Sequence, residues 1–290
     1  MKPTEHGDHA FLIVAHEDEP MLRRLVTRLS PLGHIFVHID AKTDITHWQL
    51  DDLPCRILEN RVRVFWGDWS AVEVTTLLLE AALALPNLTR FTLLSGTHYP
   101  IISNEAMDLR MRTCGNVIAS RFAPNMIDGS RPEVEYERRF YPTLIPNGVW
   151  SMTKNALMNR VVHYGHPLDW RSVAPTTGMR AGSMYWSIDR EFAQYCVQRI
   201  RSSSPLMDYF RLIVCGDEKV IATLYGEYAR EVSQEGTTYS KWTTRPHRIG
   251  KYPARLTRGD LEEVISRDLF WFARKFRSSD SEVLDWLDAI

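Results

Sequence analysis

Two short apolar runs, Phe11-Leu-Ile-Val-Ala15 and His34-Ile-Phe-Val-His-Ile39, decide the fold of this 290-residue chain. Each run is continuous rather than alternating, which is typical of strands that are covered on both faces. The segment between them repeats apolar residues at intervals of three and four and carries Pro20 near its start, which predicts a helix. The order strand, helix, strand is a βαβ unit with parallel strands.

The alternation of strands and helices continues to about residue 120. Short strands are expected at 62–65, 91–94 and 117–119. Helices are expected at 71–85 and at 103–112, the second capped by Ser103. Residues 8–120 therefore have the pattern of a doubly wound, nucleotide-binding half.

The pattern changes beyond residue 120. Residues 121–179 are rich in Pro, Gly, Asn and aromatic side chains, with one helix-like stretch at 154–163, and this predicts long loops that shape acceptor specificity. A strand at 182–188, helices at 190–200, 217–229 and 281–287, and an amphipathic, aromatic segment at 258–276 follow. We expect one domain over residues 1–290, with 121–290 as its acceptor-binding and catalytic half.

Composition limits the classes of function. The formal net charge is −1, with 35 Lys and Arg against 36 Asp and Glu, so no nucleic-acid partner is expected. The four cysteines form no CxxC pair, which fits a reducing compartment. The first apolar run is too short for a signal peptide or a membrane span. We therefore expect a cytoplasmic protein with no integral membrane segment.

Seven short motifs occur in order along the chain: Leu12-Ile-Val-Ala-His16, Val37-His-Ile-Asp40, Trp66-Gly-Asp-Trp-Ser70, Leu93-Leu-Ser-Gly96, Gly182-Ser-Met-Tyr-Trp186, Gly216-Asp-Glu218 and Phe272-Ala-Arg-Lys-Phe276. None is specific alone, but their order resembles the core-2/I-branching β-1,6-N-acetylglucosaminyltransferase and peptide O-xylosyltransferase family. Eukaryotic members are typically membrane-anchored, so this chain resembles a bacterial-type member that acts in polysaccharide or glycoconjugate biosynthesis.

The resemblance implies an α/β fold of the GT-A type, a Rossmann-like mixed and mainly parallel sheet flanked by helices. It also implies an inverting, metal-independent glycosyltransferase that moves GlcNAc or xylose from a UDP-sugar to a hydroxyl of a glycan, glycolipid or glycoprotein acceptor. No cofactor and no metal are expected beyond the UDP-sugar donor. Ligands of open α/β sheets bind outside the carboxyl ends of the strands, which agrees with this placement.

Glu218 is the expected catalytic base, because Gly216-Asp-Glu218 matches the Pro-Asp-Glu position of the family. An inverting transfer needs one carboxylate to take the proton of the acceptor hydroxyl as it attacks the anomeric carbon. The alternative is that Asp217 and Glu218 only supply favourable charge to the first turn of a helix.

The departing diphosphate needs positive charge, and no Asp-x-Asp motif follows a predicted strand. Lys275 occupies the position of the lysine that the family uses in place of a metal. Lys251 is expected as the second cation, although Arg245, Arg248 and Arg255 lie close enough in sequence to compete. The alternative for Lys275 is a place on a solvated face.

The donor nucleoside is expected at the ends of the first two strands. By resemblance, His38 and Asp40 end the strand that receives it, Asp40 bonds the uracil or ribose, and Ala15 and His16 line the base pocket. The alternative is that Asp40 only starts a turn.

Two more donor-binding residues are expected where a third strand ends. Ser95 and Gly96 could let the donor approach the backbone, or could form an ordinary turn. The family usually has an aspartate two residues after this glycine, and this chain has His98 instead.

Four side chains are expected at the acceptor: Glu137, Arg138, Tyr185 and Trp186. The aromatic pair could present ring faces to a sugar, although such residues are more often buried in a core. Trp66 and Trp69 are expected to have a structural role beside the helix that follows them.

Two other classes of protein compete with a transferase. A non-catalytic nucleotide-sugar or glycan-binding module on the same fold would account for His98 and for Gly216 in place of proline. An NAD- or ATP-dependent enzyme is not expected, because neither GxGxxG nor GxxxxGK[ST] follows the first strand.

Overall fold

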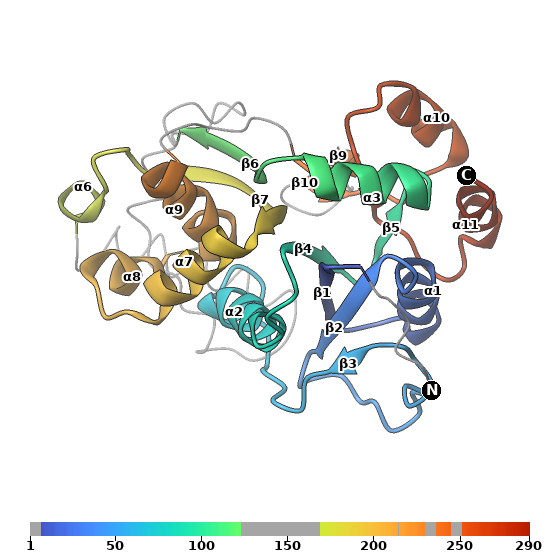
Figure 1. Cartoon of the computed structure of the whole chain (residues 1–290), viewed down its shortest axis with the longest axis horizontal. Helices are drawn as coiled ribbons and strands as arrows, with labels where there is room; N and C mark the ends of the chain where they lie inside the picture. The colour runs from blue at the N-terminus through green and yellow to red at the C-terminus, as the bar shows by residue number, and fades with distance from the viewer. Residues whose placement is uncertain (1–6, 123–168, 214, 230–235, 245–250) are drawn as a thin grey trace.

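The computed structural model describes residues 7–122, 169–213, 215–229, 236–244 and 251–290. A six-stranded sheet in the order β3-β2-β1-β4-β7-β6 forms its centre (Figure 1). Its strands are β1 (His9–Ala15), β2 (Gly33–Ile39), β3 (Arg56–Ile57), β4 (Arg90–Ser95), β6 (Val117–Phe122) and β7 (Arg180–Asp189). The first four are parallel, and β7 is antiparallel to both β4 and β6. The mixed, mostly parallel sheet predicted from the sequence is confirmed.

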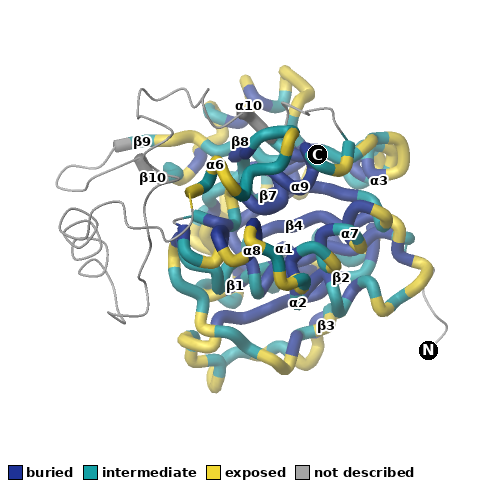
Figure 2. Tube along the Cα trace, turned by 90° about the vertical axis from the view of Figure 1, so that its left-hand side faces the viewer, coloured by how far each residue is buried: buried dark blue, intermediate teal, exposed yellow. Residues whose placement is uncertain are grey.

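Both faces of the sheet are covered, which explains the continuous apolar strands. Ala10 and Leu12 of β1 pack into one core, with α2 (Trp69–Leu83), α7 (Arg190–Arg201), α8 (Pro205–Phe210) and α9 (Val220–Ala229). Phe11 and Ile13 pack into the other, with α1 (Glu19–Leu29), α3 (Asn104–Thr113), α10 (Arg258–Ser266) and α11 (Ser281–Asp288). The buried strands run through the middle of the molecule in Figure 2. A short helix, α6 (Trp170–Val173), packs against the first core beside α8.

A smaller sheet brings the C-terminal part of the chain back to the main sheet. Its order is β5-β11-β8, where β5 is His98–Pro100, β8 is Thr238–Ser240 and β11 is Phe272–Arg274. Strands β9 (Trp242–Thr244) and β10 (Lys251–Pro253) pair with each other and form a separate two-stranded sheet. The 258–276 segment therefore contains a helix and a strand, and β11 pairs with residues more than 170 positions earlier.

The helix starts follow ordinary capping chemistry. The Asp18 side chain accepts the Met21 amide at the start of α1, and the Ser103 side chain accepts the Ala106 amide at the start of α3, as the sequence predicted for Ser103. The helix expected at 154–163 lies outside the described residues.

Two predicted elements were wrong in detail. No strand forms at 62–65, because its backbone amides bond to side chains rather than to a neighbouring strand: Val62 N–H donates to Nε2 of His38 at 2.8 Å, and Val64 N–H reaches Oδ1 of Asp40 at 3.4 Å. The edge strand is β3 instead. The helix expected at 217–229 begins only at Val220, after a separate 3₁₀ turn, Gly216–Glu218.

The predicted division near residue 120 falls inside β6, whose pairing with β7 carries the main sheet across it. Among the described residues, no helix has both the length and the apolar character needed to cross a membrane.

Candidate active site

The carboxyl ends of three parallel strands meet at one edge of the sheet, which we call the donor edge. Ala15 lies opposite Ile39, and Val14 lies opposite Ser95. Gly96 N–H donates to Val14 O at 2.9 Å, and a Cβ on Gly96 would lie only 3.2 Å from the Ala15 Cβ. The structure therefore brings together Ala15, Asp40, Ser95 and Gly96, as the sequence predicted, and a small residue at position 96 keeps two strand ends in close contact.

Asp40 is a buried carboxylate at the end of β2. Its Oδ1 accepts the Lys42 N–H at 2.8 Å, and its Oδ2 lies 3.1 Å from Lys42 Nζ. These contacts form the turn that sequence reasoning held open as the alternative to nucleoside binding. A contact between Asp40 and a nucleoside stays a prediction.

The two histidines expected at the donor have different surroundings. His38 is buried in β2. Its Nε2 accepts the backbone N–H of Val62, so this nitrogen is already used in a hydrogen bond within the protein. His16 is largely exposed, with Nε2 3.6 Å from a carboxylate oxygen of Glu17. The pKa of His16 lies below its usual value, because partial desolvation of the ring and the charge of Lys275 together outweigh the opposing charge of Glu17. His16, Glu17 and Lys275 therefore share one electrostatic environment.

Lys275 reaches the donor edge because β11 is held there. Lys275 N–H donates to Ala254 O at 3.4 Å, and Phe276 N–H donates to Thr97 O at 3.0 Å. Lys275 Nζ lies 3.3 Å from Oε1 of Glu17, in the loop after β1. The predicted diphosphate lysine thus lies beside the predicted donor-binding strand ends.

The candidates for the second cation at the diphosphate differ in what the structure shows of them. Lys251 begins β10, three residues before Ala254, whose carbonyl accepts the Lys275 amide. Arg255 forms an ion pair with Asp280, while Arg245 and Arg248 lie outside the described residues.

Arg274 is a candidate cation that sequence reasoning missed as a ligand. Its guanidinium lies over the Tyr185 ring at 4.9 Å, and its Nε is buried without a hydrogen-bond partner in the described part of the chain. A buried guanidinium nitrogen with no acceptor is costly unless a ligand supplies one. The signal in the sequence was its place beside Lys275 in Phe-Ala-Arg-Lys-Phe.

His98, the departure from the family pattern, is a buried packing residue. Its ring meets Tyr185 edge-on at 4.3 Å, its Nδ1 accepts the Ser95 N–H at 3.0 Å, and the Ser95 hydroxyl lies 2.8 Å from the same nitrogen. Burial, and then the charge of Arg274, holds the pKa of His98 well below its usual value. The imidazole is therefore neutral at neutral pH, and position 98 places no negative charge at the donor edge.

Tyr185 lies between His98 and Arg274 and is nearly enclosed. Burial raises the pKa of its hydroxyl, Arg274 and a hydrogen bond with Ser95 lower it, and the carboxylates of Asp217 and Glu218 raise it. The pKa of this phenol is therefore influenced by one cation, Arg274, and by two carboxylates. Its ring contacts His98 and Arg274 and is nearly enclosed, so the predicted role in acceptor stacking has little support.

Glu218 lies on the 3₁₀ turn and is exposed, as a base that meets an incoming hydroxyl must be. The turn is held by Cys215 N–H, which donates to Gly67 O at 2.8 Å, and by Glu218 N–H, which donates to Cys215 O at 3.2 Å. A Cβ on Gly216 would lie 3.2 Å from Phe210 O, so the turn packs closely on the chain before it.

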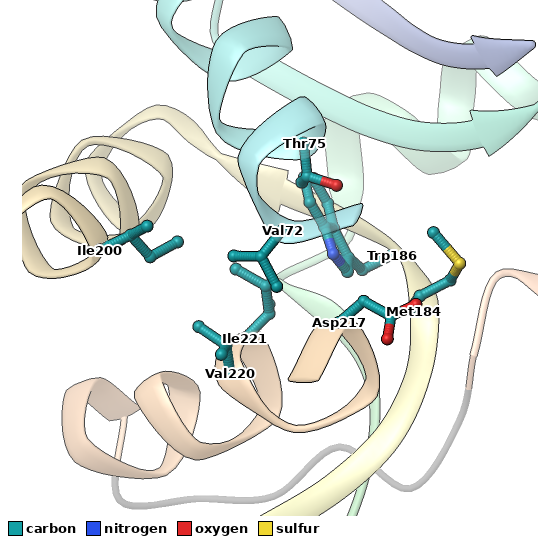
Figure 3. A pocket seen from close by; sticks show the side chains of 8 residues that line it. All are labelled: Val72, Thr75, Met184, Trp186, Ile200, Asp217, Val220 and Ile221. Atoms are coloured by element: carbon teal, nitrogen blue, oxygen red, sulfur yellow. The ribbon is translucent and has the colours of Figure 1, made fainter. Parts of the chain in front are cut away.

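Unlike the exposed side chain of Glu218, the side chain of Asp217 lines a small cavity (Figure 3). The cavity measures about 10 Å³, close to the space that one water molecule needs. Oδ1 of Asp217 and Nε1 of Trp186 both lack a hydrogen-bond partner among the described residues, and both residues line this cavity. Burial raises the pKa of Asp217, and Lys219 lowers it.

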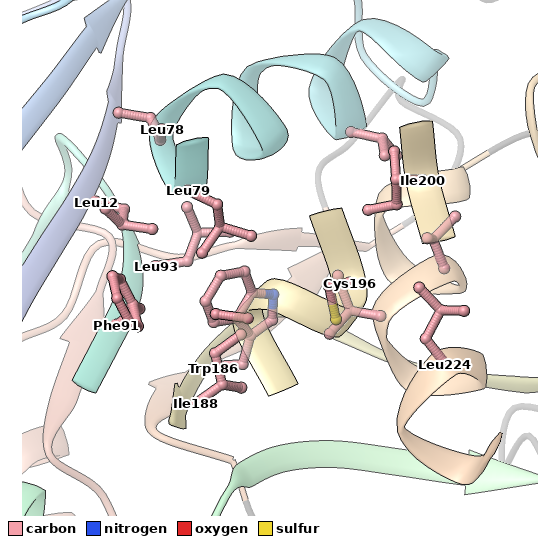
Figure 4. Close-up of a cluster of buried hydrophobic side chains, with 14 of the residues drawn as sticks. Leu12, Leu78, Leu79, Phe91, Leu93, Trp186, Ile188, Cys196, Ile200 and Leu224 are labelled. Carbon is pink, nitrogen blue, oxygen red and sulfur yellow. The ribbon is translucent and has the colours of Figure 1, made fainter. Parts of the chain in front are cut away.

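Of the acceptor residues predicted from the sequence, Trp186 needs correction. Trp186 is 0% exposed and packs in the core among Leu79, Ile188 and Cys196, so an acceptor cannot reach its ring (Figure 4). Met184 and Ile188 lie on the same face of β7 as Trp186 and pack in or against the same core, which favours burial over a sugar-binding role. Glu137 and Arg138 lie outside the described residues.

Trp66 and Trp69, expected to act alike, differ. Trp69 begins α2, packs against the first core, and has the Arg211 guanidinium over its ring at 5.2 Å. Trp66 is 65% exposed. Because the Trp66 side chain is mostly exposed, the prediction that it packs beside the following helix is wrong. Across the described residues, no three His, Cys, Asp or Glu side chains are grouped as a metal site.

The chain is similar to known proteins in its sequence pattern and, only weakly, in its structure. Among solved structures, the mannose-1-phosphate geranyltransferase of Thermus thermophilus matches at 13% identity with a TM-score of 0.32, over 71% of this chain and 68% of that chain. A search of curated proteins found no match. The sequence pattern of the Core-2/I-Branching enzyme family matches residues 9–265, a span that includes Glu218 and ends before Lys275. The chain therefore belongs to the Core-2/I-Branching enzyme family, and this membership implies glycosyltransferase activity.

Proposed function

We propose that this protein is an inverting, metal-independent glycosyltransferase with a GT-A-type fold, which transfers GlcNAc or xylose from a UDP-sugar to a hydroxyl of a glycan, glycolipid or glycoprotein. Family membership supports the reaction class. The observation that carries the mechanism is that Lys275 lies beside the carboxyl ends of the parallel strands, where the next residue, Phe276, donates its N–H to Thr97 O at 3.0 Å. A cation for the leaving group therefore lies at the edge where ligands of open α/β sheets bind.

Glu218 acts as the general base in this proposal. Its carboxylate takes the proton from the acceptor hydroxyl while the hydroxyl oxygen bonds to the anomeric carbon, and the bond to the diphosphate oxygen breaks on the opposite side. Attack opposite the leaving group inverts the anomeric configuration. A positioned base of this kind contributes roughly 10² to 10⁴ in rate.

Lys275 neutralises the leaving diphosphate, helped by Arg274 or Lys251. One cation about 4 Å from a phosphate oxygen interacts by roughly 4 kcal/mol at an effective dielectric of 20, so two of them can replace much of the charge of a metal ion. Lys275 must exchange Glu17 for the diphosphate as the donor binds, because the two side chains are 3.3 Å apart without it. The buried Nε of Arg274 would gain the acceptor that it lacks.

The nucleoside is expected over the ends of β1 and β2, beside Ala15, His16 and Asp40. Uridine comes from the family resemblance. His38 is engaged with the backbone of Val62, so we assign it to support of the pocket wall rather than to direct donor contact.

Thermal unfolding in the presence of UDP, GDP, CDP, ADP or NAD, each with EDTA and with manganese, tests this function. A ligand at 100 times its dissociation constant adds about 2.7 kcal/mol, which raises the midpoint by roughly 4 °C for a chain of this size. We expect a shift that is selective for UDP and equal in EDTA. A shift that requires manganese would contradict the metal-independent mechanism, and a preference for another nucleotide would contradict the donor.

A transfer assay with UDP-GlcNAc and UDP-xylose then separates catalysis from binding. Release of UDP that depends on an added acceptor supports the transferase. UDP binding without turnover over a broad panel of donors and acceptors would instead favour a nucleotide-sugar-binding module.

A further inference from the structure

The small cavity next to the 3₁₀ turn is lined by eight side chains, and three of them carry nitrogen or oxygen: Thr75 of α2, Trp186 of β7 and Asp217 of the turn itself (Figure 3). Both α2 and β7 pack against the turn, so these three polar side chains meet only in the folded chain. The proposed transfer reaction uses none of them.

Two polar atoms at this cavity lack a partner. Across the described residues, Nε1 of Trp186 and Oδ1 of Asp217 are buried and make no hydrogen bond. Trp186 is fully buried, and an indole nitrogen can only donate, whereas a carboxylate oxygen accepts. Buried polar groups in folded proteins nearly always have a partner, either in the protein or in an ordered water. A donor and an acceptor at one cavity are the two groups that a single water molecule bridges.

The cavity has the size and the polarity that one water molecule needs. Its volume of about 10 Å³ is near the lower limit for one water. The Thr75 hydroxyl donates to Ala71 O at 2.9 Å, and its oxygen keeps lone pairs that can accept a proton from another donor. A water at this place would accept the Trp186 N–H and donate to Asp217 and Thr75, and about three hydrogen bonds are usual for an internal water.

The Asp217 carboxylate is also joined to the backbone of the proposed base. Burial raises the pKa of Asp217, the charge of Lys219 lowers it, and hydrogen bonds from the backbone of Asp217 and of Glu218 lower it further. Glu218 N–H donates to Cys215 O at 3.2 Å as well. A group that holds the Asp217 side chain therefore also restrains the turn at Glu218.

We propose that Thr75, Trp186 and Asp217 bind one ordered water molecule, and that Asp217, held by this water, is a positioning residue for Glu218. The water joins α2 and β7 to the 3₁₀ turn and limits the movement of the turn, so that Glu218 meets the acceptor hydroxyl at a fixed distance. Trp186 thereby acts as a hydrogen-bond donor within the core. The effect on transfer rests on the proposed function, while the water site does not depend on it.

Water-selective NMR on the full chain with isotope-labelled tryptophan tests the site. The indole signal of Trp186 is identified by its loss in Trp186→Phe. We expect a cross-peak between this indole N–H and a long-lived water in wild type, and a much weaker one in Thr75→Val. Thr76→Val is the matched control and should keep the cross-peak. Thr76 is the next residue of α2, and its hydroxyl likewise donates to the carbonyl four residues earlier, at 2.8 Å, but it is not among the residues that line the cavity.

Transfer assays, UDP titrations and amide exchange test the positioning role. In Thr75→Val and Trp186→Phe we expect kcat to fall about tenfold while UDP affinity stays within about twofold, because a loosened base is less often aligned with the hydroxyl. Exchange of the Glu218 backbone amide should accelerate in both variants, since its bond to Cys215 O opens more often. Thr76→Val should leave all three quantities unchanged.

The outcomes separate this inference from the proposed function. The inference is overturned if the Trp186 indole of wild type shows no contact with water, or if Glu218 amide exchange is equal in Thr75→Val and Thr76→Val. A UDP affinity that falls as much as kcat would also contradict a positioning role. Failure of the transferase proposal appears instead as the absence of acceptor-dependent UDP release by wild type, and the two NMR measurements still decide the inference. Thr75→Val, which replaces a hydroxyl by a methyl group, keeps the test decisive if Trp186→Phe does not fold.

Discussion

The donor edge and the 3₁₀ turn of residues 216–218, which we call the catalytic turn because it carries the proposed base, are built in different ways. At the donor edge, parallel strands set the positions of Ala15, Asp40 and Gly96 through a regular hydrogen-bond ladder. The catalytic turn holds Glu218 through single contacts, of which the bond from Cys215 to Gly67 is one. The first region depends on local sequence patterns, and the second depends on segments that meet only after folding. Substitutions at the turn should therefore affect the reaction, and substitutions at the edge should affect donor affinity.

The largest expected effect separates the two regions directly. Glu218→Gln removes the base but keeps the shape of the side chain, so transfer should fall by about 10² to 10⁴ while UDP affinity stays within about twofold. Steady-state transfer and a UDP titration measure the two quantities. Glu105→Gln, at an exposed position of α3, is the control. Retained turnover in Glu218→Gln would contradict its role as base.

The next effect concerns the donor edge. Lys275→Ala should weaken UDP binding about 10- to 100-fold, because a charge-assisted hydrogen bond contributes about 1.5–3 kcal/mol. Calorimetric titration in EDTA measures the loss, and Lys275→Arg should recover part of it. Arg267→Ala, at an exposed position at the end of α10, should leave the affinity unchanged. An unaltered UDP affinity in Lys275→Ala would move the diphosphate site to other cations.

A smaller effect tests the buried side of the catalytic turn. Burial raises the pKa of Asp217 above the 3.8 of an ordinary aspartate, so the folded chain holds this proton more tightly than the unfolded chain does. The free energy of unfolding of wild type therefore loses a contribution as the pH rises from 3.8 through the raised value. Asp217→Asn lacks this titration.

The stability gain of Asp217→Asn over wild type should grow across that pH window and level off above it, at on the order of 1 kcal/mol. Urea unfolding at a series of pH values measures it, with Asp51→Asn, at an exposed position, as the control. A difference that does not change with pH would show that Asp217 is not strained by burial.

The smallest expected effect concerns the ion pair between Glu17 and Lys275 at the donor edge. Glu17→Gln removes the carboxylate that pairs with Lys275 at 3.3 Å, and exposed pairs of this kind contribute about 0.2–1 kcal/mol. UDP affinity should therefore rise by up to about fivefold, with less gain at high salt. The double variant with Lys275→Ala should lose this gain. Weaker UDP binding in Glu17→Gln would indicate that Glu17 contacts the donor itself.

Sequence reasoning was strongest where one stretch of chain determines its own structure. The apolar runs of β1 and β2, the helix between them and the Ser103 cap were all predicted, because strand burial, helical periodicity and capping depend on neighbouring residues. The same logic brought Ala15, Asp40, Ser95 and Gly96 to one edge, since the carboxyl ends of adjacent parallel strands share a side of the sheet.

Sequence reasoning was weakest for residue types that are common both in the core and on the surface. Trp66 and Trp186 are both tryptophans in motifs of the family, but one is exposed and the other is in the core. The alternation of strands and helices does not show which face of β7 meets α2, nor whether the amides of 62–65 bond to a strand or to side chains. These outcomes depend on packing between elements far apart in sequence.

By itself, the sequence determined the kinds and order of the elements, the meeting of the first strand ends, and the family to which the chain belongs, because propensity, periodicity and motif order are local properties. Only the tertiary structure decided that Lys275 lies beside Glu17, that Arg274 lies over the Tyr185 ring, and that Gly67 bonds to Cys215 before the turn that carries Glu218. These pairs are separated by about 90 to more than 250 residues, and only the folding of both faces of the sheet brings them into contact.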